Sequence, residues 1–296
     1  MDLLIDVIKD TGIDALKILP FLFVTYLLME TLEHHAGEHT QELVEKSGHF
    51  GPLLGGLFGV IPQCGFSAAA SNLYAGRVIT LGTLIAIYLS TSDEMLPLLI
   101  SAQVPLSMML YTLLIKAVIG IIAGFIIDFI IHRYHKIRNM SLNDPLQIDA
   151  LCEKEHCHCE EDESNAGIFK SALVHTVHIF IYIIIITFIL NTAIALIGED
   201  TLSGFLSGAP VLSHIIAGII GLIPNCAASI IITELYLEGM ITFGSMMSGL
   251  LVGAGIGLLV LFRVNPKIKA NINITIILYF IGTISGLLID LLGIAL

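Results

Sequence analysis

Apolar residues follow one another in long segments with few charged side chains between them. The segments cover residues 18–29, 104–131, 171–198, 240–262 and 270–296. Most of them are long enough to cross the roughly 30 Å of hydrocarbon in a lipid bilayer as an α-helix. A strand of a membrane barrel would instead alternate apolar and polar residues. The pattern therefore predicts an all-α polytopic membrane protein.

The chain also repeats itself. Gly-Val-Ile-Pro-Gln-Cys at positions 59–64 returns 162 residues later as Gly-Leu-Ile-Pro-Asn-Cys at positions 221–226. Ten of the 24 residues from 59 to 82 are identical to their counterparts. An internal repeat in a strongly apolar chain is typical of transporters that are built from two related halves.

Polar positions divide the chain into a first membrane repeat (1–133), a polar linker (134–168) and a second membrane repeat (169–296). Short basic loops face the cytoplasm, which places the loops around Arg133 and Lys267 on that side. Counting from these loops gives about five membrane segments in each half. Because this number is odd, we expect two inverted repeats, with the N-terminus outside.

A proline and a cysteine lie in the middle of a short apolar stretch in each half, at Pro62-Gln63-Cys64 and at Pro224-Asn225-Cys226. Proline removes a backbone donor and interrupts a helix. We expect broken helices at these Pro-x-Cys motifs, as re-entrant hairpins or as short crossings. Broken backbone at membrane depth lines a cavity or is buried, and in inverted-repeat transporters such breaks bind the substrate.

Cys64 and Cys226 are counterparts in the repeat and are predicted to supply two thiolate ligands for a soft metal or a trivalent metalloid. The alternative is two small buried residues where helices approach closely. The half-helices that begin after each break also direct free N–H groups and a partial positive charge inward, which favours an anion. The residues leave the choice between a metal and an anion open.

Asp93 and Glu94 interrupt an apolar run in the first half only, since their counterparts are Gly255 and Ile256. Carboxylates at membrane depth are costly and usually functional. We predict that they bind a hard cation such as manganese or carry the proton of a coupled cycle. The alternative is a short polar break near the membrane surface.

Other residues of the apolar segments have less specific interpretations. Asp128 and Asp290 are counterparts at the ends of their segments and are expected to be interface residues rather than ligands. Lys116 is expected to neutralise a carboxylate or to extend along its helix to the membrane surface. Gly253 and Gly257 form a small-xxx-small pair, which indicates close helix packing or a moving interface.

The polar linker carries a Cys/His tract within an acidic sequence, formed by Cys152, His156, Cys157, His158 and Cys159. This composition is typical of metal binding, although the tract lacks the paired Cys-x-x-Cys spacing of a structural zinc site. We interpret it as a mobile collector of soft metal or as a sensor, the alternative being a solvated acidic linker. A cytoplasmic location would keep these thiols reduced.

Composition excludes several other functions. A mean hydropathy of +0.92 excludes an ordinary soluble domain. A net charge of −12 argues against nucleic acid as a partner. The sequence has neither the Gly-x-x-x-x-Gly-Lys-Ser/Thr motif of nucleotide hydrolases nor a His-Glu-x-x-His motif. We therefore expect no enzyme and no cofactor, and a transport cycle driven by an ion gradient or a partner ATPase.

The paired Gly-x-Ile-Pro-x-Cys segments, the Leu-Tyr that follows each and the Cys/His-rich patch resemble the ten-helix heavy-metal exporter family. Its members are often named arsenic efflux permeases or manganese transporters. The resemblance covers nearly the whole chain and is strongest at residues 59–82 and 221–244. It implies a prokaryotic inner-membrane permease that exports a metal or metalloid, with a pathway lined by Pro62, Gln63, Cys64, Pro224, Asn225 and Cys226.

Our first hypothesis is therefore a multi-pass secondary transporter of the inner membrane. It would export arsenite or a divalent metal such as manganese by alternating access, coupled to a proton or sodium ion. The second hypothesis is a transporter of an organic or inorganic anion bound at the opposed half-helix N-termini. The third, from another class, is a membrane metal sensor. A homo-oligomer is compatible with all three.

Overall fold

The computed structural model describes residues 11, 12, 16, 19, 20, 22–24, 26, 27, 50–61, 64–92, 95–101, 103–138, 165–197 and 210–294. Regular structure within these residues is helical, which confirms the predicted all-α class. Before the linker lie α3 (Gly51–Gly59), α4 (Cys64–Ala75), α5 (Leu81–Ser90), α6 (Met95–Ser101) and α7 (Leu106–Arg138). After it lie α9 (Asn165–Ile197), α11 (Pro210–Gly221), α12 (Cys226–Leu237), α13 (Phe243–Val252), α14 (Ile256–Val264) and α15 (Ile268–Leu291).

Among the described residues, three segments are long and apolar enough to cross a membrane, namely Leu106–Tyr134, Phe243–Val264 and Ile268–Leu291. Large apolar side chains cover the outer surfaces of α7 and α15, as Ile122 and Ile284 illustrate with exposed fractions of 53% and 52%. Lipid is the solvent that accepts such surfaces. The protein is therefore a multi-pass membrane protein.

The helices follow the spacing of the sequence repeat. α4 begins at Cys64 and α12 begins at Cys226, and each has 12 residues. α5 and α13 correspond in the same way, with 10 residues each. The short helices expected before the Pro-x-Cys motifs are present, since α3 ends at Gly59 and α11 ends at Gly221. The opposite orientation of the two halves in the membrane stays a prediction.

The turns that follow α4 and α12 have the same backbone hydrogen bonds. Val78 N–H donates to the Leu73 carbonyl at 2.8 Å, and Met240 N–H donates to the Leu235 carbonyl at 2.9 Å. The residue before each donor is left-handed, with φ 63° at Arg77 and φ 74° at the equivalent glycine. This is the hydrogen-bond pattern of a Schellman C-cap. Equivalent sequences therefore end their helices in the same way.

The segment 240–262, predicted as one uninterrupted span, is broken. α13 ends at Val252, and α14 begins at Ile256. Gly255 between them has φ 53° and ψ −139°, a conformation that essentially only glycine adopts. The sequence prediction missed this break because no proline marks it, and its glycines were interpreted as a packing surface or a moving interface between helices.

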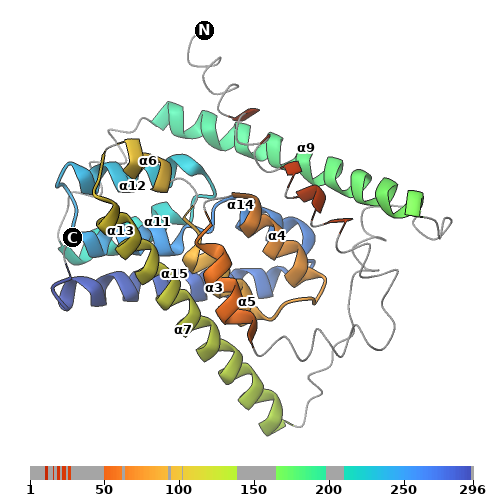
Figure 1. The fold of residues 1–296 in the computed structure, drawn as a ribbon, viewed down its shortest axis with the longest axis horizontal. Helices are drawn as coiled ribbons and strands as arrows, with labels where there is room; N and C mark the ends of the chain where they lie inside the picture. Colours follow the sequence, from red (N-terminus) through yellow and green to blue (C-terminus); the bar gives the residue numbers. More distant parts are fainter. Residues whose placement is uncertain are drawn as a thin grey trace.

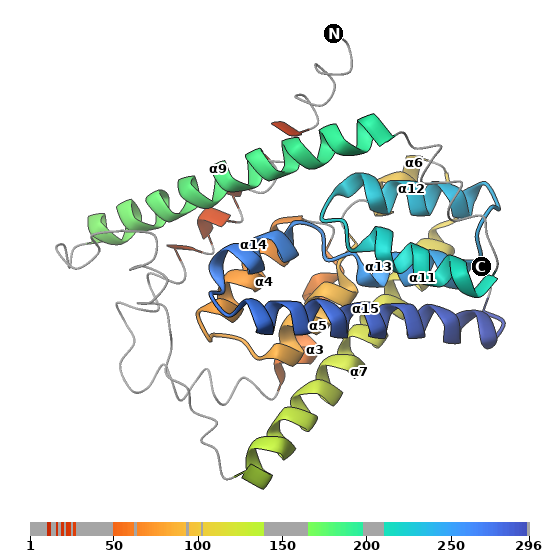
Figure 2. The same cartoon turned by 180° about the vertical axis from the view of Figure 1, so that it is seen from behind.

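Helices pair within each half, and some of them also contact helices of the other half. α5 packs along α7, and α13 packs along α15. Glycines allow this approach, because a Cβ on Gly124 of α7 would lie 2.6 Å from the carbonyl oxygen of Gly82 on α5. Between the halves, α4 packs on α14, and α12 contacts α6 (Figures 1 and 2). The first half thus supports the broken helix of the second.

α9 runs along one side of the helix bundle (Figures 1 and 2). Ala172 and Ile183 on its buried face pack with Val260 of α14 in a separate hydrophobic cluster. Ile181 and Ile185 on the opposite face are exposed. α9 contains most of the apolar segment predicted at 171–198 and begins within the segment assigned to the linker.

The contact between α4 and α14 gives a stability prediction. A Cβ added at Gly257 would lie 2.7 Å from the Cβ of Ser67, so Gly257→Ala should destabilise the protein by about 1–3 kcal/mol. Gly253→Ala is the matched control, because its Cβ would come no closer than 3.4 Å to other atoms. Thermal unfolding in detergent measures both. Equal midpoints for the two variants would show that α4 and α14 are not packed as described.

Candidate functional site

The first turns of α4 and α12, which begin at the two cysteines of the repeat, converge on the break between α13 and α14. A Cβ on Gly257 would lie 2.7 Å from the Cβ of Ser67, and one on Gly253 would lie 3.6 Å from Oγ of Ser229. Ser67 and Ser229 are counterparts three residues after the cysteines. Four residues of extended chain span at most about 14 Å. The two helix N-termini therefore lie at the two ends of one short backbone segment.

The structure describes only part of the predicted site. Cys64 and Cys226 are the first residues of their helices. Pro224 is partly buried, and Asn225 is 4% exposed, with its N–H donating to the Ile223 carbonyl at 2.7 Å. The remaining predicted residues lie outside the described part of the chain: Pro62, Gln63, Asp93, Glu94, Cys152, His156, Cys157, His158 and Cys159.

Buried hydroxyl groups lie on α4 and at the end of α5. Ser67, Ser71 and Ser90 are fully buried, and Thr91 and Ser92 are nearly so. The N-terminus of a helix carries free N–H groups and a partial positive charge. This polar region within an apolar bundle can therefore hold a thiolate, an oxyanion or a hydroxide of a metalloid.

The carbonyl of Gly257 ties the break to the first half. Ser71 Oγ donates to it at 2.7 Å, and the hydroxyl of Tyr88 donates to it at 3.1 Å. The two hydroxyl oxygens are also 2.7 Å apart, and both side chains are fully buried. Backbone at membrane depth must find partners within the protein. These bonds from α4 and α5 position the start of α14.

Lys116 provides a hydrogen-bond donor for a backbone carbonyl at the end of α13. Its Nζ donates to the Leu250 carbonyl at 2.7 Å, and the residue is 1% exposed. A cation at this place is favourable, because a helix C-terminus carries free carbonyls and partial negative charge. The side chain therefore does not extend to the membrane surface, which was one of the two expectations. The counterpart of Lys116 is Leu278, so this cation belongs to one half only.

Hydroxyl groups donate to the backbone carbonyls at the end of α5, which is the counterpart of the end of α13. Thr91 Oγ1 donates to the Ile87 carbonyl at 2.7 Å, and Ser90 Oγ donates to the Ala86 carbonyl at 2.7 Å. These residues come directly before Asp93 and Glu94 in the sequence. The carboxylates therefore follow a helix end whose carbonyls already have donors. Their predicted roles as ligands or proton carriers stay predictions.

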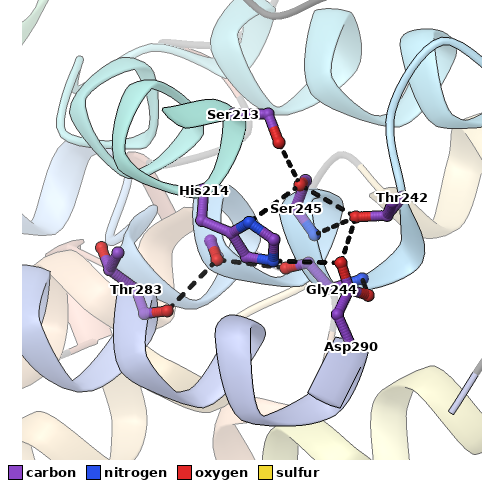
Figure 3. A network of polar contacts seen from close by, with 8 residues as sticks. Ser213, His214, Thr242, Gly244, Ser245, Thr283 and Asp290 are labelled. Carbon is purple, nitrogen blue, oxygen red and sulfur yellow. Dashed lines mark hydrogen bonds and ion pairs between the residues drawn. The ribbon is translucent and has the colours of Figure 1, made fainter. Parts of the chain in front are cut away.

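Asp128 and Asp290 act as helix caps at the start of α5 and α13. Asp128 accepts hydrogen bonds from the Gly82 N–H at 2.8 Å and from the Thr80 hydroxyl at 2.7 Å. Asp290 accepts from the Gly244 N–H at 2.7 Å and from the hydroxyl of Thr242 (Figure 3). An anion at a helix N-terminus is stabilising. The two aspartates thus hold equivalent helix pairs together.

His214 also contacts this cap and was missed by the sequence prediction. Its Nε2 lies 3.1 Å from Asp290 Oδ2 (Figure 3). The available signal was a histidine inside an apolar segment, at the place where the first half has Pro52. Only folding brings it to an aspartate 76 residues later in the chain, the difference between positions 214 and 290.

Within the described residues, no three side chains of His, Cys, Asp or Glu gather into a group that could hold a metal ion. The predicted acidic ligands and the Cys/His tract lie outside those residues. The geometry that is described therefore consists of the converging helix ends, their hydroxyl groups and the Lys116 cap.

Comparison with known proteins gives one match. A family model, ArsP_2, described as "Putative, 10TM heavy-metal exporter" matches residues 1–205 and 175–294. No curated protein and no solved structure matches the chain.

The hydroxyl pair at Gly257 predicts an energetic coupling. Ser71→Ala and Tyr88→Phe should each cost about 0.5–1.5 kcal/mol of unfolding free energy. The double variant should lose less than the sum of the two, because each single change already breaks the bond between the hydroxyls. Denaturant unfolding in detergent tests this. Ser71→Ala with Tyr279→Phe is the control pair and should be additive; additivity for Ser71 and Tyr88 would contradict the contact.

Proposed function

Because the chain belongs to this family of ten-helix heavy-metal exporters, we propose that it is a secondary transporter that exports a heavy metal or metalloid. The proposed cargo is arsenite or a divalent metal such as manganese. The proposed location is the inner membrane of a prokaryotic cell. The apolar helices support the membrane-embedded part of this proposal.

The observation that carries the proposal is the convergence of the two cysteine-initiated helices on the α13–α14 break. Cys64 and Cys226 each begin a half-helix, and the first turns of both half-helices reach residues 253–257. Two thiols at the starts of these helices would suit a soft metal or a trivalent metalloid. The helix N-termini beside them favour the negative charge that a thiolate ligand carries.

Alternating access between two halves is the proposed mechanism. Support comes from the equivalent helix pairs in each half and from the packing of α4 on α14 and the contact of α12 with α6 across the halves. Rocking of one half would change the contacts of α4 on α14 and thereby the exposure of the site. Inverted-repeat transporters of other folds work in this way.

Asp93 and Glu94 are proposed to add oxygen ligands or to bind the coupling ion, a proton or sodium. They follow the capped end of α5, whose counterpart is the end of α13 at the α13–α14 break. The Cys/His tract at residues 152–159 is proposed to collect metal on the cytoplasmic side. A cluster of thiols and imidazoles next to carboxylates binds soft metals without a fixed geometry.

A second candidate function is transport of an oxyanion or organic anion. The convergence of two helix N-termini favours it, because their free N–H groups can bind an anion without any thiol. Exchange of the thiols for hydroxyls separates the two functions. An anion site should tolerate the exchange, whereas a thiol-lined site should lose its cargo.

The proposal predicts a change in the metal content of cells. A metal-sensitive bacterium that expresses the chain should contain less of one element from a panel of manganese, zinc and arsenite. Cys64→Ser/Cys226→Ser should restore the content, because serine is a poor ligand for soft ions. Elemental analysis of washed cells measures this, with membrane abundance of each variant determined in parallel.

The matched control replaces the other three cysteines, at positions 152, 157 and 159. This control removes three thiols, whereas Cys64→Ser/Cys226→Ser removes two. It leaves the proposed membrane site intact, so most of the export should remain. Unchanged content for every element in cells with the wild-type protein would contradict metal export.

A further inference from the structure

His214 is a buried titratable group that the proposed substrate site does not use. It lies on α11, and its side chain is 3% exposed. Pro52 occupies the equivalent position in the first half and packs against Gly124 instead. A buried ionisable side chain at membrane depth is costly and usually functional.

Two polar partners hold the imidazole between neighbouring helices (Figure 3). Nδ1 lies 3.3 Å from the hydroxyl of Ser245 on α13. Nε2 lies 3.1 Å from Asp290 Oδ2 on α15, which is close enough for an ion pair although the N–H is not aligned for a hydrogen bond. The side chain of Asp290 is 23% exposed. The carboxylate of the pair therefore reaches the surface of the bundle, whereas the imidazole does not.

The first half shows that the aspartate cap does not need the histidine. Asp128 caps α5 through Thr80 and Gly82 with the same two kinds of hydrogen bond that Asp290 makes. Proline stands in the histidine's place there. His214 is therefore an ionisable group added to a cap that forms without it.

Few other titratable groups face His214 from the helices that pack against α11. α13 carries none. On α15, Tyr279 donates its hydroxyl to the Ile215 carbonyl at 3.3 Å. On α12, Glu234 is exposed, and the ring of Tyr236 packs on Phe243. Asp290 is thus the carboxylate at ion-pair distance from His214 within the described residues.

The order Ser245–His214–Asp290 is also that of a hydrolase triad, but its serine is unsuited to a reaction. Ser245 is fully buried, and its hydroxyl lies 2.6 Å from that of Ser213 and 2.9 Å from that of Thr242. A nucleophile must reach a substrate atom. The network therefore serves to place the imidazole rather than to attack a bond.

We propose that His214 and Asp290 form a proton-binding site that couples the proton to movement of α11. With the proton bound, imidazolium and carboxylate attract each other and tie α11 to α15. When the proton leaves to water, this attraction is lost, and α11 is held less firmly to α15. α11 leads through the turn at residues 222–225 into α12, which begins at Cys226. Proton binding is thereby linked to the position of one helix N-terminus of the substrate site.

The role in coupling rests on the proposed function, whereas proton binding does not. Proton binding is tested first, on the full chain in detergent with ¹⁵N-labelled histidine rings. The signal that disappears in His214→Gln belongs to His214. We expect the wild-type ring to show both the neutral and the protonated form, since the proposed site binds and releases a proton. In Asp290→Asn the protonated form should be less populated at pH 6, because the compensating carboxylate is gone.

Coupling is tested in proteoliposomes that contain a pH-sensitive dye, with gradients of Mn²⁺ and, separately, of arsenite. In the wild type, flux of the transported species should drive proton flux. In His214→Gln and in Asp290→Asn that flux should continue while proton flux falls to the background of protein-free vesicles. His178→Gln is the matched control, since His178 is exposed on α9, and it should keep the wild-type ratio.

The outcomes are distinguishable. A His214 signal that stays neutral throughout pH 5–8 overturns the proton-binding site. An unchanged ratio of proton to Mn²⁺ or arsenite flux in both variants overturns its role in coupling. Absence of both Mn²⁺ and arsenite flux in the wild type overturns the proposed function, while the histidine spectra still decide proton binding. Flux of Mn²⁺ or arsenite without proton flux in the wild type overturns only the role of the site in coupling. If His214→Gln does not fold, Asp290→Asn alone decides the coupling test by flux. The change that Asp290→Asn causes in the histidine spectrum then decides the proton-binding test.

Discussion

The structure depends on how broken backbone inside an apolar bundle finds hydrogen-bond partners. The carbonyl of Gly257, at the start of α14, accepts bonds from Ser71 and Tyr88 of the other half. The carbonyl of Leu250, at the end of α13, accepts one from Lys116. Without water in the hydrocarbon region, each of these groups would be left unpaired at a cost of several kcal/mol. The two halves therefore meet at the break, which in turn holds the first turns of α4 and α12.

The two halves have equivalent helix caps and turns but differ in their buried ionisable side chains. The helix caps of Asp128 and Asp290 and the turns after α4 and α12 are equivalent in geometry. The buried basic groups are not equivalent, because Lys116 has a leucine as its counterpart and His214 has a proline. A symmetric frame suits a site that must open alternately to two sides. An ionisable group that has no counterpart in the other half suits a coupling ion that binds apart from the cargo.

The sequence predicted the frame better than the contacts within it. The 162-residue spacing predicted that the two halves correspond, and α4 and α12 begin 162 residues apart. A proline within an apolar run is a local signal that interrupts a helix. The break at Gly255 has no such signal, since glycine is equally typical of close packing between helices.

The partners of Lys116 and His214 were beyond prediction for a different reason. Lys116 bonds to a carbonyl 134 residues away, and His214 contacts an aspartate on another helix. Both contacts depend on how helices pack and not on any local pattern. The same holds for the approach of α4 and α12 to one backbone segment, which the repeat alone does not imply.

The central claim is that Cys64 and Cys226, at the starts of these two helices, come close enough to share one ligand. Phenylarsine oxide, which bridges two thiols, tests it on protein whose other three cysteines are replaced by serine. Intact-mass spectrometry should show one arsenical per chain and no thiol left to react with a maleimide. Replacing either Cys64 or Cys226 by serine in this protein should abolish the stable adduct. Two arsenicals per chain, or two thiols that still react, would show that the cysteines are apart and would contradict the account.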